Sequence, residues 1–358
     1  MSLCPTSLLL LLPNCGVKKM TRDQKAKKDS QALSRYKRIL KRQKDYAWGP
    51  RYNPATRAVR GEAPRISVAS TIPAKLLQRQ VHALSNPEKY CFALALYHPK
   101  LWEFHDQHVL YPSAKQHPLA AHSRFSSQAW PSTTGTFRIA KRLGLEHPMV
   151  WEPKNQSNPH HATLDELLDS EATGRHLPTP YQGDALLFMR DECGEYLLSW
   201  DVKAKTGDHA QPGGEMIDQM RNGATERAQA RDEIYVEYMR ELGIRIVRIS
   251  LDDIPSNICA RLHFLALAHT QPIDLPHAMV ADLLGAFQLA IPKQQIPLEI
   301  INRHIKTDRQ FIAAKNLLQI AVWERKLRVD LRHPVLVDKP LVPESIDLLV
   351  EFGHLFAR

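Results

Sequence analysis

The sequence lacks the cysteine patterns that indicate zinc sites or disulfide frameworks. Its five cysteines are scattered and include no C-x-x-C pair. An odd number of cysteines without a spacing pattern argues against both kinds of cross-link and fits a reducing, cytoplasmic environment. The 17 histidines include no H-E-x-x-H spacing, so we expect them to be ordinary surface and core residues.

Long apolar runs and phosphate-binding glycine loops are also missing. The apolar run at residues 8–12 is far shorter than the ~20 residues that span a bilayer, so no membrane partner is expected. Lys18 and Lys19 follow this run, which is the reverse of the order in a secretory signal. We expect residues 1–19 to be a disordered extension or to come from an over-long start assignment. No P-loop, Rossmann glycine pattern or internal repeat occurs.

The charge of the chain is strongly unbalanced. Its formal net charge is +10, which favours an anionic partner, with nucleic acid as the first candidate. Residues 18–60 contain many lysines and arginines but only three acids, and three aromatic residues (Tyr46, Trp48, Tyr52) follow a potential helix at residues 32–45. We predict that residues 1–60 form a basic, largely disordered arm that contacts the DNA backbone by counterion release. The alternative is a solvated tail without a partner.

Two apolar runs of strand length form the centre of the sequence, at residues 183–189 and 196–203. The polar segment between them contains Gly194, which indicates an antiparallel hairpin. The expected order of elements around it is helix, strand, hairpin, helix and strand. This order predicts an α/β core, with a mixed sheet flanked by helices. The expected helices and strands outside the hairpin are at residues 85–98, 104–111, 224–242 and 244–250.

Charged side chains stand at the ends of this hairpin. Asp184 opens the first strand, and Asp201-Val202-Lys203 closes the second. Side chains alternate along a strand, so Asp201 and Lys203 share a face, and the hairpin can bring Asp184 against them. Two converging carboxylates with the Val202 carbonyl beside them favour Mg²⁺, with Mn²⁺ as an alternative. The less specific interpretation is a turn aspartate and an exposed ion pair.

Glu88 is the candidate third carboxylate. Ser85, Pro87 and Glu88 begin the predicted helix as a capping box, which by itself explains the glutamate. Glu88 also shares a helical stripe with apolar residues, which would turn it toward the core. Both interpretations remain open at this stage.

A second unit is predicted from about residue 253. Four helical segments precede a short strand at residues 327–331, a combination that favours a winged-helix-like module. The predicted division is therefore residues 1–60 for the arm, 61–252 for the α/β core and 253–358 for the helical module. The four helical segments are at residues 258–269, 277–290, 297–305 and 308–324.

The joint order of several motifs resembles the TnsA-type endonuclease subunit of heteromeric, Tn-seven-like transposases, a branch of the PD-(D/E)xK nucleases. The resemblance covers roughly residues 80–335. The motifs are Ser85-x-x-Glu88, Trp102-x-Phe104-x-Asp106-Gln107-His108-Val109-Leu110, Ile139-Ala140-x-x-Leu143-Gly144-Leu145-x-His147-Pro148, Gly183-Asp184, Asp201-Val202-Lys203 and Arg325-Lys326-Leu327-Arg328-Val329-Asp330-Leu331.

The resemblance implies a restriction-endonuclease-like catalytic domain and a winged-helix-like domain that binds partner proteins. It assigns catalytic roles to Glu88, Asp184 and Lys203, and metal ligation to Glu88, Asp184, Asp201 and Val202. Family members often have glutamine at the position of Asp201, so the number of metal ions is not fixed by the resemblance.

The implied activity is cleavage of the 5′ strands at transposon ends in double-stranded DNA, in the bacterial cytoplasm. The implied partners are a DDE-type transposase and an AAA+ ATPase regulator. Two alternatives remain: a stand-alone restriction-type or junction-resolving nuclease, and a DNA-binding module without catalysis. Fold-level analogy alone does not separate them.

Overall fold

The computed structural model describes residues 22–64, 67–153, 170–171, 174–210 and 222–358. Its strands are β1 (Ser70–Ala74), β2 (Arg79–Ala83), β3 (Leu101–Leu110), β4 (Lys115–Gln116), β5 (Ser132–Thr133), β6 (Met149–Pro153), β7 (Ser170–Glu171), β8 (Gly174–Pro178), β9 (Tyr181–Asp191), β10 (Gly194–Lys203) and β11 (Arg245–Ser250). Its α-helices are α1 (Arg22–Gln43), α2 (Asn86–Tyr97), α3 (Thr136–Leu143), α4 (Gly207–Ala210), α5 (Asn222–Glu241), α6 (Ser256–Ala268), α7 (His277–Ala290), α8 (Pro297–His304), α9 (Asp308–Trp323) and α10 (Leu348–Glu351).

The central sheet is mixed and has the strand order β11-β10-β9-β3. Strands β3, β9 and β10 are antiparallel neighbours, whereas β10 and β11 run parallel and are connected through α5. A parallel pair needs such a crossover, because a tight turn cannot return the chain in the same direction. The predicted order of elements, from α2 through the hairpin to β11, is confirmed, as is the mixed sheet flanked by helices. Gly194 has φ +108° at the hairpin turn.

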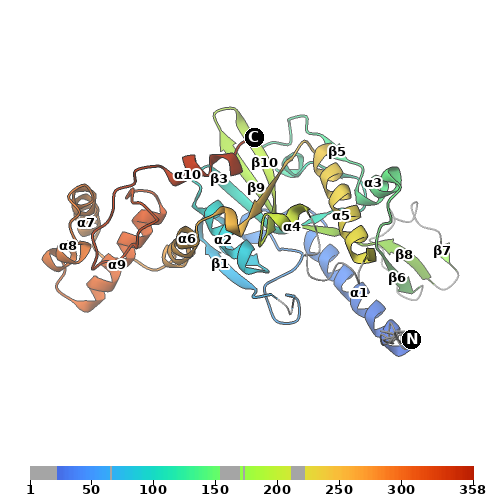
Figure 1. Cartoon of the computed structure of the whole chain (residues 1–358), viewed down its shortest axis with the longest axis horizontal. Helices are drawn as coiled ribbons and strands as arrows, with labels where there is room; N and C mark the ends of the chain where they lie inside the picture. Colours follow the sequence, from blue (N-terminus) through green and yellow to red (C-terminus); the bar gives the residue numbers. More distant parts are fainter. Residues whose placement is uncertain (1–21, 65–66, 154–169, 172–173, 211–221) are drawn as a thin grey trace, which may run out of the picture.

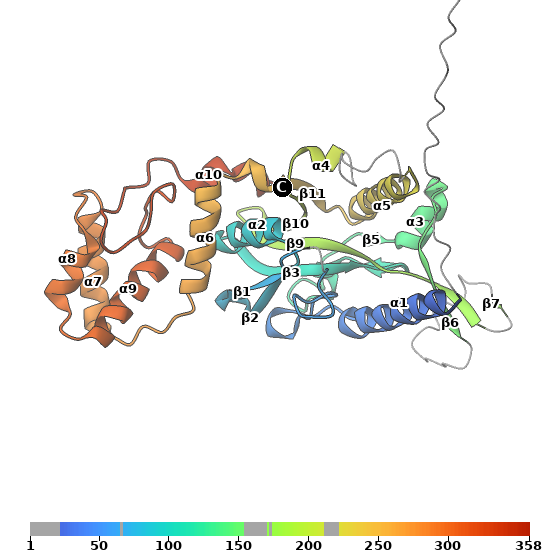
Figure 2. The ribbon, with the colours of Figure 1, turned by 60° about the horizontal axis from the view of Figure 1, so that its bottom comes forward.

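The two faces of this sheet are covered by different helices. Leu187, Leu198 and Trp200 belong to a core shared with α2 and α6. The alternate residues Leu186 and Phe188 pack with side chains of α3 and α5. This alternation follows from the two-residue period of a strand. Figures 1 and 2 show α7, α8 and α9 at one end of the molecule and the small sheet β6-β8-β7 at the other.

The described part of the basic arm is packed, which corrects the prediction of a largely disordered segment over residues 1–60. Helix α1 buries Leu33 and Tyr36 against Val150 and Leu177 of the small sheet, and it buries Ile39 in a separate cluster against β3. Apolar residues three apart in the sequence place these side chains on one face of the helix. Burial of this apolar face stabilises the packed position of α1 even though the rest of the helix is strongly charged. Residues 1–21 lie outside the described part of the chain.

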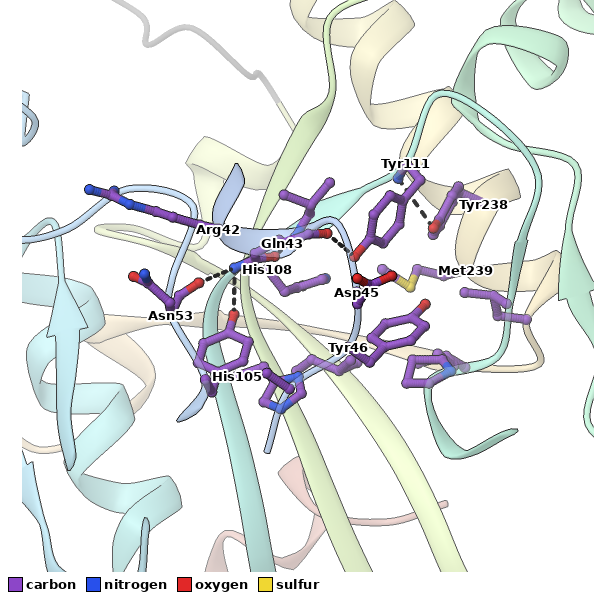
Figure 3. Close-up of a pocket in the computed structure, with 17 residues that line it drawn as sticks. Arg42, Gln43, Asp45, Tyr46, Asn53, His105, His108, Tyr111, Tyr238 and Met239 are labelled. Carbon is purple, nitrogen blue, oxygen red and sulfur yellow. Dashed lines mark hydrogen bonds between the residues drawn. The ribbon is translucent and has the colours of Figure 1, made fainter. Parts of the chain in front are cut away.

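Gln43 fixes the end of α1 to the central sheet. Its carboxamide nitrogen donates to the Tyr52 hydroxyl and the Asn53 carbonyl, both at 3.0 Å, and its oxygen accepts from the Val109 amide at 2.8 Å. The Tyr111 hydroxyl donates to the Gln43 carbonyl at 2.5 Å. These groups surround a cavity of about 30 Å³ (Figure 3). The segment after α1 is therefore part of the folded core.

The helical module after residue 253 shares its core with the α/β unit. Buried residues of α6, α7 and α9 belong to the same apolar cluster as the sheet and α2. The segment 327–331 does not form a strand and makes an isolated bridge, between Val329 and Pro343. The predicted division at residue 253 therefore marks a change of architecture without a break in the core. Among the described residues, no helix is both long and apolar enough to cross a membrane.

The carboxy-terminal residues return to the central sheet. The Trp200 indole nitrogen donates to the Leu355 carbonyl at 3.2 Å, and the Tyr196 hydroxyl donates to the Phe356 carbonyl at 2.8 Å. The Phe356 ring also lies 5.4 Å from the ring of Trp200 between centroids. The last residues therefore close one face of the strand that carries Asp201 and Lys203.

Candidate active site

The hairpin brings three of the predicted site residues together. Trp200 pairs with Ala185 at the last paired step of the β9–β10 register, so Asp201 and Asp184 follow as the next opposing positions. Asp184 accepts a hydrogen bond from the Val202 amide at 2.8 Å. The Lys203 ammonium lies 2.5 Å from an oxygen of Asp201. The prediction that Asp201 and Lys203 share a face is confirmed.

Gly183 permits this arrangement. A Cβ atom at this position would lie 2.2 Å from a ring carbon of His108 on β3. His108 is buried, and burial lowers its pKa to about 3, so the ring is neutral. A glycine is therefore required where β9 passes the His108 ring, directly before Asp184.

A cavity of about 260 Å³ opens beside the three charged residues. Sequence reasoning did not identify the side chains that complete it. Arg231 and Tyr235 lie one helical turn apart on α5, a spacing that was readable from the sequence. His209, on the short helix α4, had no recognisable sequence signal. The short helix α4 thus places His209 directly after the strand that carries Asp201 and Lys203.

His209 and Tyr235 support the strand that carries Asp201. The His209 Nδ1 atom lies 3.3 Å from the second oxygen of Asp201, and its Nε2 atom lies 3.3 Å from the Ile249 carbonyl. The Tyr235 hydroxyl lies 2.7 Å from the Ser199 hydroxyl. Both oxygens of Asp201 are thus engaged, one by Lys203 and the other by His209.

The pKa values of Asp184 and Lys203 each depend on the charges of the neighbouring site residues. Burial and the neighbouring Asp201 raise the pKa of Asp184, and the positive charge of Lys203 opposes this increase. Burial disfavours the charge of Lys203, but Asp184 and Asp201 outweigh burial and raise the pKa of its ammonium. Lys203 is therefore protonated at neutral pH. Two carboxylates that repel each other in a desolvated position are the arrangement that a cation stabilises.

Glu88 combines the two roles that the sequence left open. One carboxylate oxygen accepts from the Leu84 amide and from the Gln107 carboxamide, both at 2.8 Å, and the other accepts from the Ser85 hydroxyl at 2.9 Å. The Ser85 hydroxyl in turn accepts from the Glu88 amide. Glu88 is therefore part of a helix cap. Burial and the nearby charge of Asp184 raise the pKa of Glu88 to about 8. The Glu88 carboxyl therefore also interacts electrostatically with the carboxylates of the site.

Gln107 was missed as a functional candidate, and it links Glu88 to the sheet. It lies on β3 between Asp106 and His108, which pair with Ala185 and Gly183, so it stands opposite Asp184. Its φ is +49°, an uncommon value for a residue with a side chain. The Ala55 amide donates to its carbonyl at 3.1 Å. This backbone conformation is accompanied by a contact from residue 55, which no local pattern could reveal.

The donor set fits a divalent cation at its centre. Within the described ranges, no group of three or more His, Cys, Asp or Glu side chains is arranged as a metal site. Asp184 and Asp201 nevertheless supply carboxylate oxygens of the kind that Mg²⁺ prefers, and burial, which raises the pKa of Asp184, disfavours its charge unless a cation compensates for it. Glu88 and the Val202 carbonyl remain predicted metal ligands. The observed contacts of Glu88 are those of its helix cap, and Val202 contacts Asp184 through its amide and not through its carbonyl.

The pH dependence of stability should report on Glu88. The pKa of about 8 exceeds the ordinary 4.5, so between these values the folded protein binds more protons than the unfolded chain. The free energy of unfolding should therefore fall as the pH rises through this window. Glu88→Gln should reduce this fall, because an amide does not titrate in this window. Its carbonyl still provides the acceptor for the Leu84 amide and the Gln107 carboxamide.

Urea unfolding at pH 5 and pH 8 with EDTA would measure the effect. The exposed Glu226→Gln provides the matched control and should follow the wild type. Parallel pH profiles for wild type and Glu88→Gln would contradict the assignment.

The sequence matches no protein-family model, and a search of curated proteins also finds no match. Function is therefore inferred from the geometry of this site.

Proposed function

We propose that this protein is a divalent-metal-dependent DNA endonuclease with a PD-(D/E)xK site. One observation carries the proposal: the β9–β10 hairpin sets Asp184 against Asp201-x-Lys203 at the edge of a cavity. Glu88, on the helix before β3, is coupled to the same carboxylates through its charge. The net charge of +10 suits a polyanionic substrate.

The topology supports a restriction-endonuclease-like core. Helix α2 precedes β3 in the chain, β3, β9 and β10 lie side by side as antiparallel strands, and the crossover helix α5 leads to the parallel strand β11; β4 to β8 and α3 are inserted between β3 and β9. Helices α6 to α9, with the Val329–Pro343 bridge as a minimal wing, are proposed as the winged-helix-like unit that binds partners. Its exposed apolar side chains include Leu289 and Ile312.

The mechanism assigns distinct tasks to the charged side chains. Mg²⁺ or Mn²⁺, held by Asp184 and Asp201 with Glu88 and the Val202 carbonyl as the further predicted ligands, would supply Lewis-acid stabilisation of the charge on the scissile phosphate. Lys203 remains protonated beside these carboxylates, so it acts as a hydrogen-bond donor to the attacking water or the phosphate and not as a base. His209 holds the second oxygen of Asp201 and thereby fixes its orientation.

The biological role that fits the sequence resemblance is the endonuclease subunit of a heteromeric transposase. In this role it cleaves the 5′ strands at transposon ends, together with a DDE-type transposase and under an AAA+ ATPase regulator. The proposed location is the bacterial cytoplasm, in association with DNA. The helical end of the molecule offers a surface for the partner proteins.

The proposal predicts cleavage that requires both metal and partner. Purified protein with Mg²⁺ and transposon-end duplex should cut little or nothing alone, because uncontrolled cutting would fragment the host DNA. With its transposase it should cut the 5′ strands, as resolved on denaturing gels with each strand labelled. Efficient double-strand cutting without a partner would instead favour a stand-alone restriction-type nuclease. Absence of cleavage with every partner and metal would refute the endonuclease.

A further inference from the structure

The segment that follows Lys203 is fastened to the turn that follows β11. Lys203 and Ser250 are the last paired residues of the parallel strands β10 and β11, so the two segments leave the sheet at the same edge. The Thr206 amide lies 3.2 and 3.3 Å from the two carboxylate oxygens of Asp252. The Thr206 hydroxyl lies 3.1 Å from an oxygen of Asp252 and 3.1 Å from an oxygen of Asp253. Two neighbouring carboxylates therefore hold one threonine.

Helix α4 connects this threonine to the candidate site. It begins directly after Thr206 and carries His209, whose amide donates to the Thr206 carbonyl at 3.3 Å. The two ring nitrogens of His209 lie 3.3 Å from an oxygen of Asp201 and 3.3 Å from the Ile249 carbonyl. The His209 side chain is only 9% exposed. Because a single hydrogen-bonded turn joins the two residues, a displacement of Thr206 also displaces His209.

The two carboxylates that hold Thr206 differ in their other contacts. Asp253 also accepts from the Ser250 amide at 2.9 Å, so it serves the turn in which it lies. Within the described part of the chain, the hydrogen bonds to the Asp252 side chain all come from Thr206. Asp252 is exposed and does not line the cavity beside Asp201. Its removal therefore leaves no hole in the core and takes no group from the cavity.

We propose that Asp252 is a positioning residue of the candidate site, which holds His209 against Asp201 through Thr206 and α4. This inference rests on the proposed function, in which Asp201 is a metal ligand. Groups that orient a metal ligand from outside change metal affinity by about 10- to 100-fold when they are removed. Asp252 thus acts on the metal site without touching the metal, and its effect passes through His209.

Mn²⁺ binding by the full-length protein without DNA tests the inference, with the free ion measured by electron paramagnetic resonance. His209→Ala should weaken binding about tenfold, and Asp252→Ala, one step further from the ligand, about fivefold. The double variant should also lose about tenfold, because both residues act along one path. Independent effects would instead multiply to about 50-fold. Asp282→Ala removes an exposed aspartate of α7 and should bind Mn²⁺ like the wild type.

Asp252→Asn separates position from charge. Asparagine keeps one oxygen acceptor for Thr206 but lacks the negative charge, so it should retain most of the affinity that Asp252→Ala loses. An asparagine variant as weak as the alanine variant would show that charge alone matters, and would overturn the inference. Wild-type affinity for Asp252→Ala would overturn it as well, and so would a 50-fold loss in the double variant.

Nuclear magnetic resonance distinguishes failure of this inference from failure of the proposed function. The ring ¹⁵N signals of His209, assigned with His209→Gln, report its contact with Asp201 in the absence of metal. They should shift in Asp252→Ala but not in Asp282→Ala. Unshifted signals in Asp252→Ala would overturn the inference even for a protein that cuts DNA. A wild type that binds no Mn²⁺ would refute the proposed metal site, whereas shifted signals would still support the positioning of His209 by Asp252.

Discussion

Asp184→Asn and Lys203→Ala should each lower the rate of DNA cleavage by on the order of 100- to 1000-fold, the usual cost of removing one group that stabilises transition-state charge. Asparagine keeps an oxygen acceptor for the Val202 amide at 2.8 Å, so the hairpin should remain intact. It lacks the negative charge that a divalent cation requires. Loss of Lys203 removes the positive charge nearest both carboxylates and the donor to the attacked group.

Single-turnover cleavage with the partner transposase and saturating protein would measure this loss. Asp208→Asn is the matched control, because Asp208 lines the same cavity but accepts from the Lys205 amide in its own turn. It should cleave at close to the wild-type rate. Circular dichroism should be unchanged in all three variants, and DNA affinity should be unchanged in Asp184→Asn and Asp208→Asn. Full Mg²⁺-dependent cleavage by Asp184→Asn would remove the basis of the proposed site.

The parts of the fold that sequence reasoning predicted correctly depend on local signals. The hairpin followed from two apolar runs around a glycine turn. The pairing of Asp201 with Lys203 followed from strand alternation. The capping interaction of Glu88 was predicted from its position three residues after Ser85 in the sequence.

The features that were missed depend on contacts between distant residues. The apolar face of α1 is hidden among lysines and arginines, and its burial depends on Val150 and Leu177. The left-handed conformation of Gln107 accompanies a backbone contact from residue 55. Similarly, the return of the last residues to Trp200 leaves no pattern in either segment. Local sequence patterns therefore identify the strands that carry the candidate site more readily than the distant contacts that hold these strands in place.

The carboxy-terminal residues should be essential for stability despite their distance from the site in sequence. Leu355 and Phe356 are each only 3% exposed, and they cover Trp200 on β10. Loss of buried apolar side chains of this size costs about 2–5 kcal/mol each, which is a large share of a typical free energy of unfolding. Removal of residues 353–358 should therefore lower stability by several kcal/mol and disturb the strand that carries Asp201.

A shorter deletion provides the control for this prediction. Removal of residues 357–358 deletes the partly exposed ion pair between Arg358 and Asp191 but leaves Phe356 in place. A pair of this kind contributes about 1 kcal/mol or less, so urea midpoints should change little. The two truncations should thus differ sharply in denaturant unfolding of the full chain, and the longer one should lose cleavage in parallel with stability. Equal, small shifts would show that the carboxy terminus does not close the core, and that the α/β unit is stable without it.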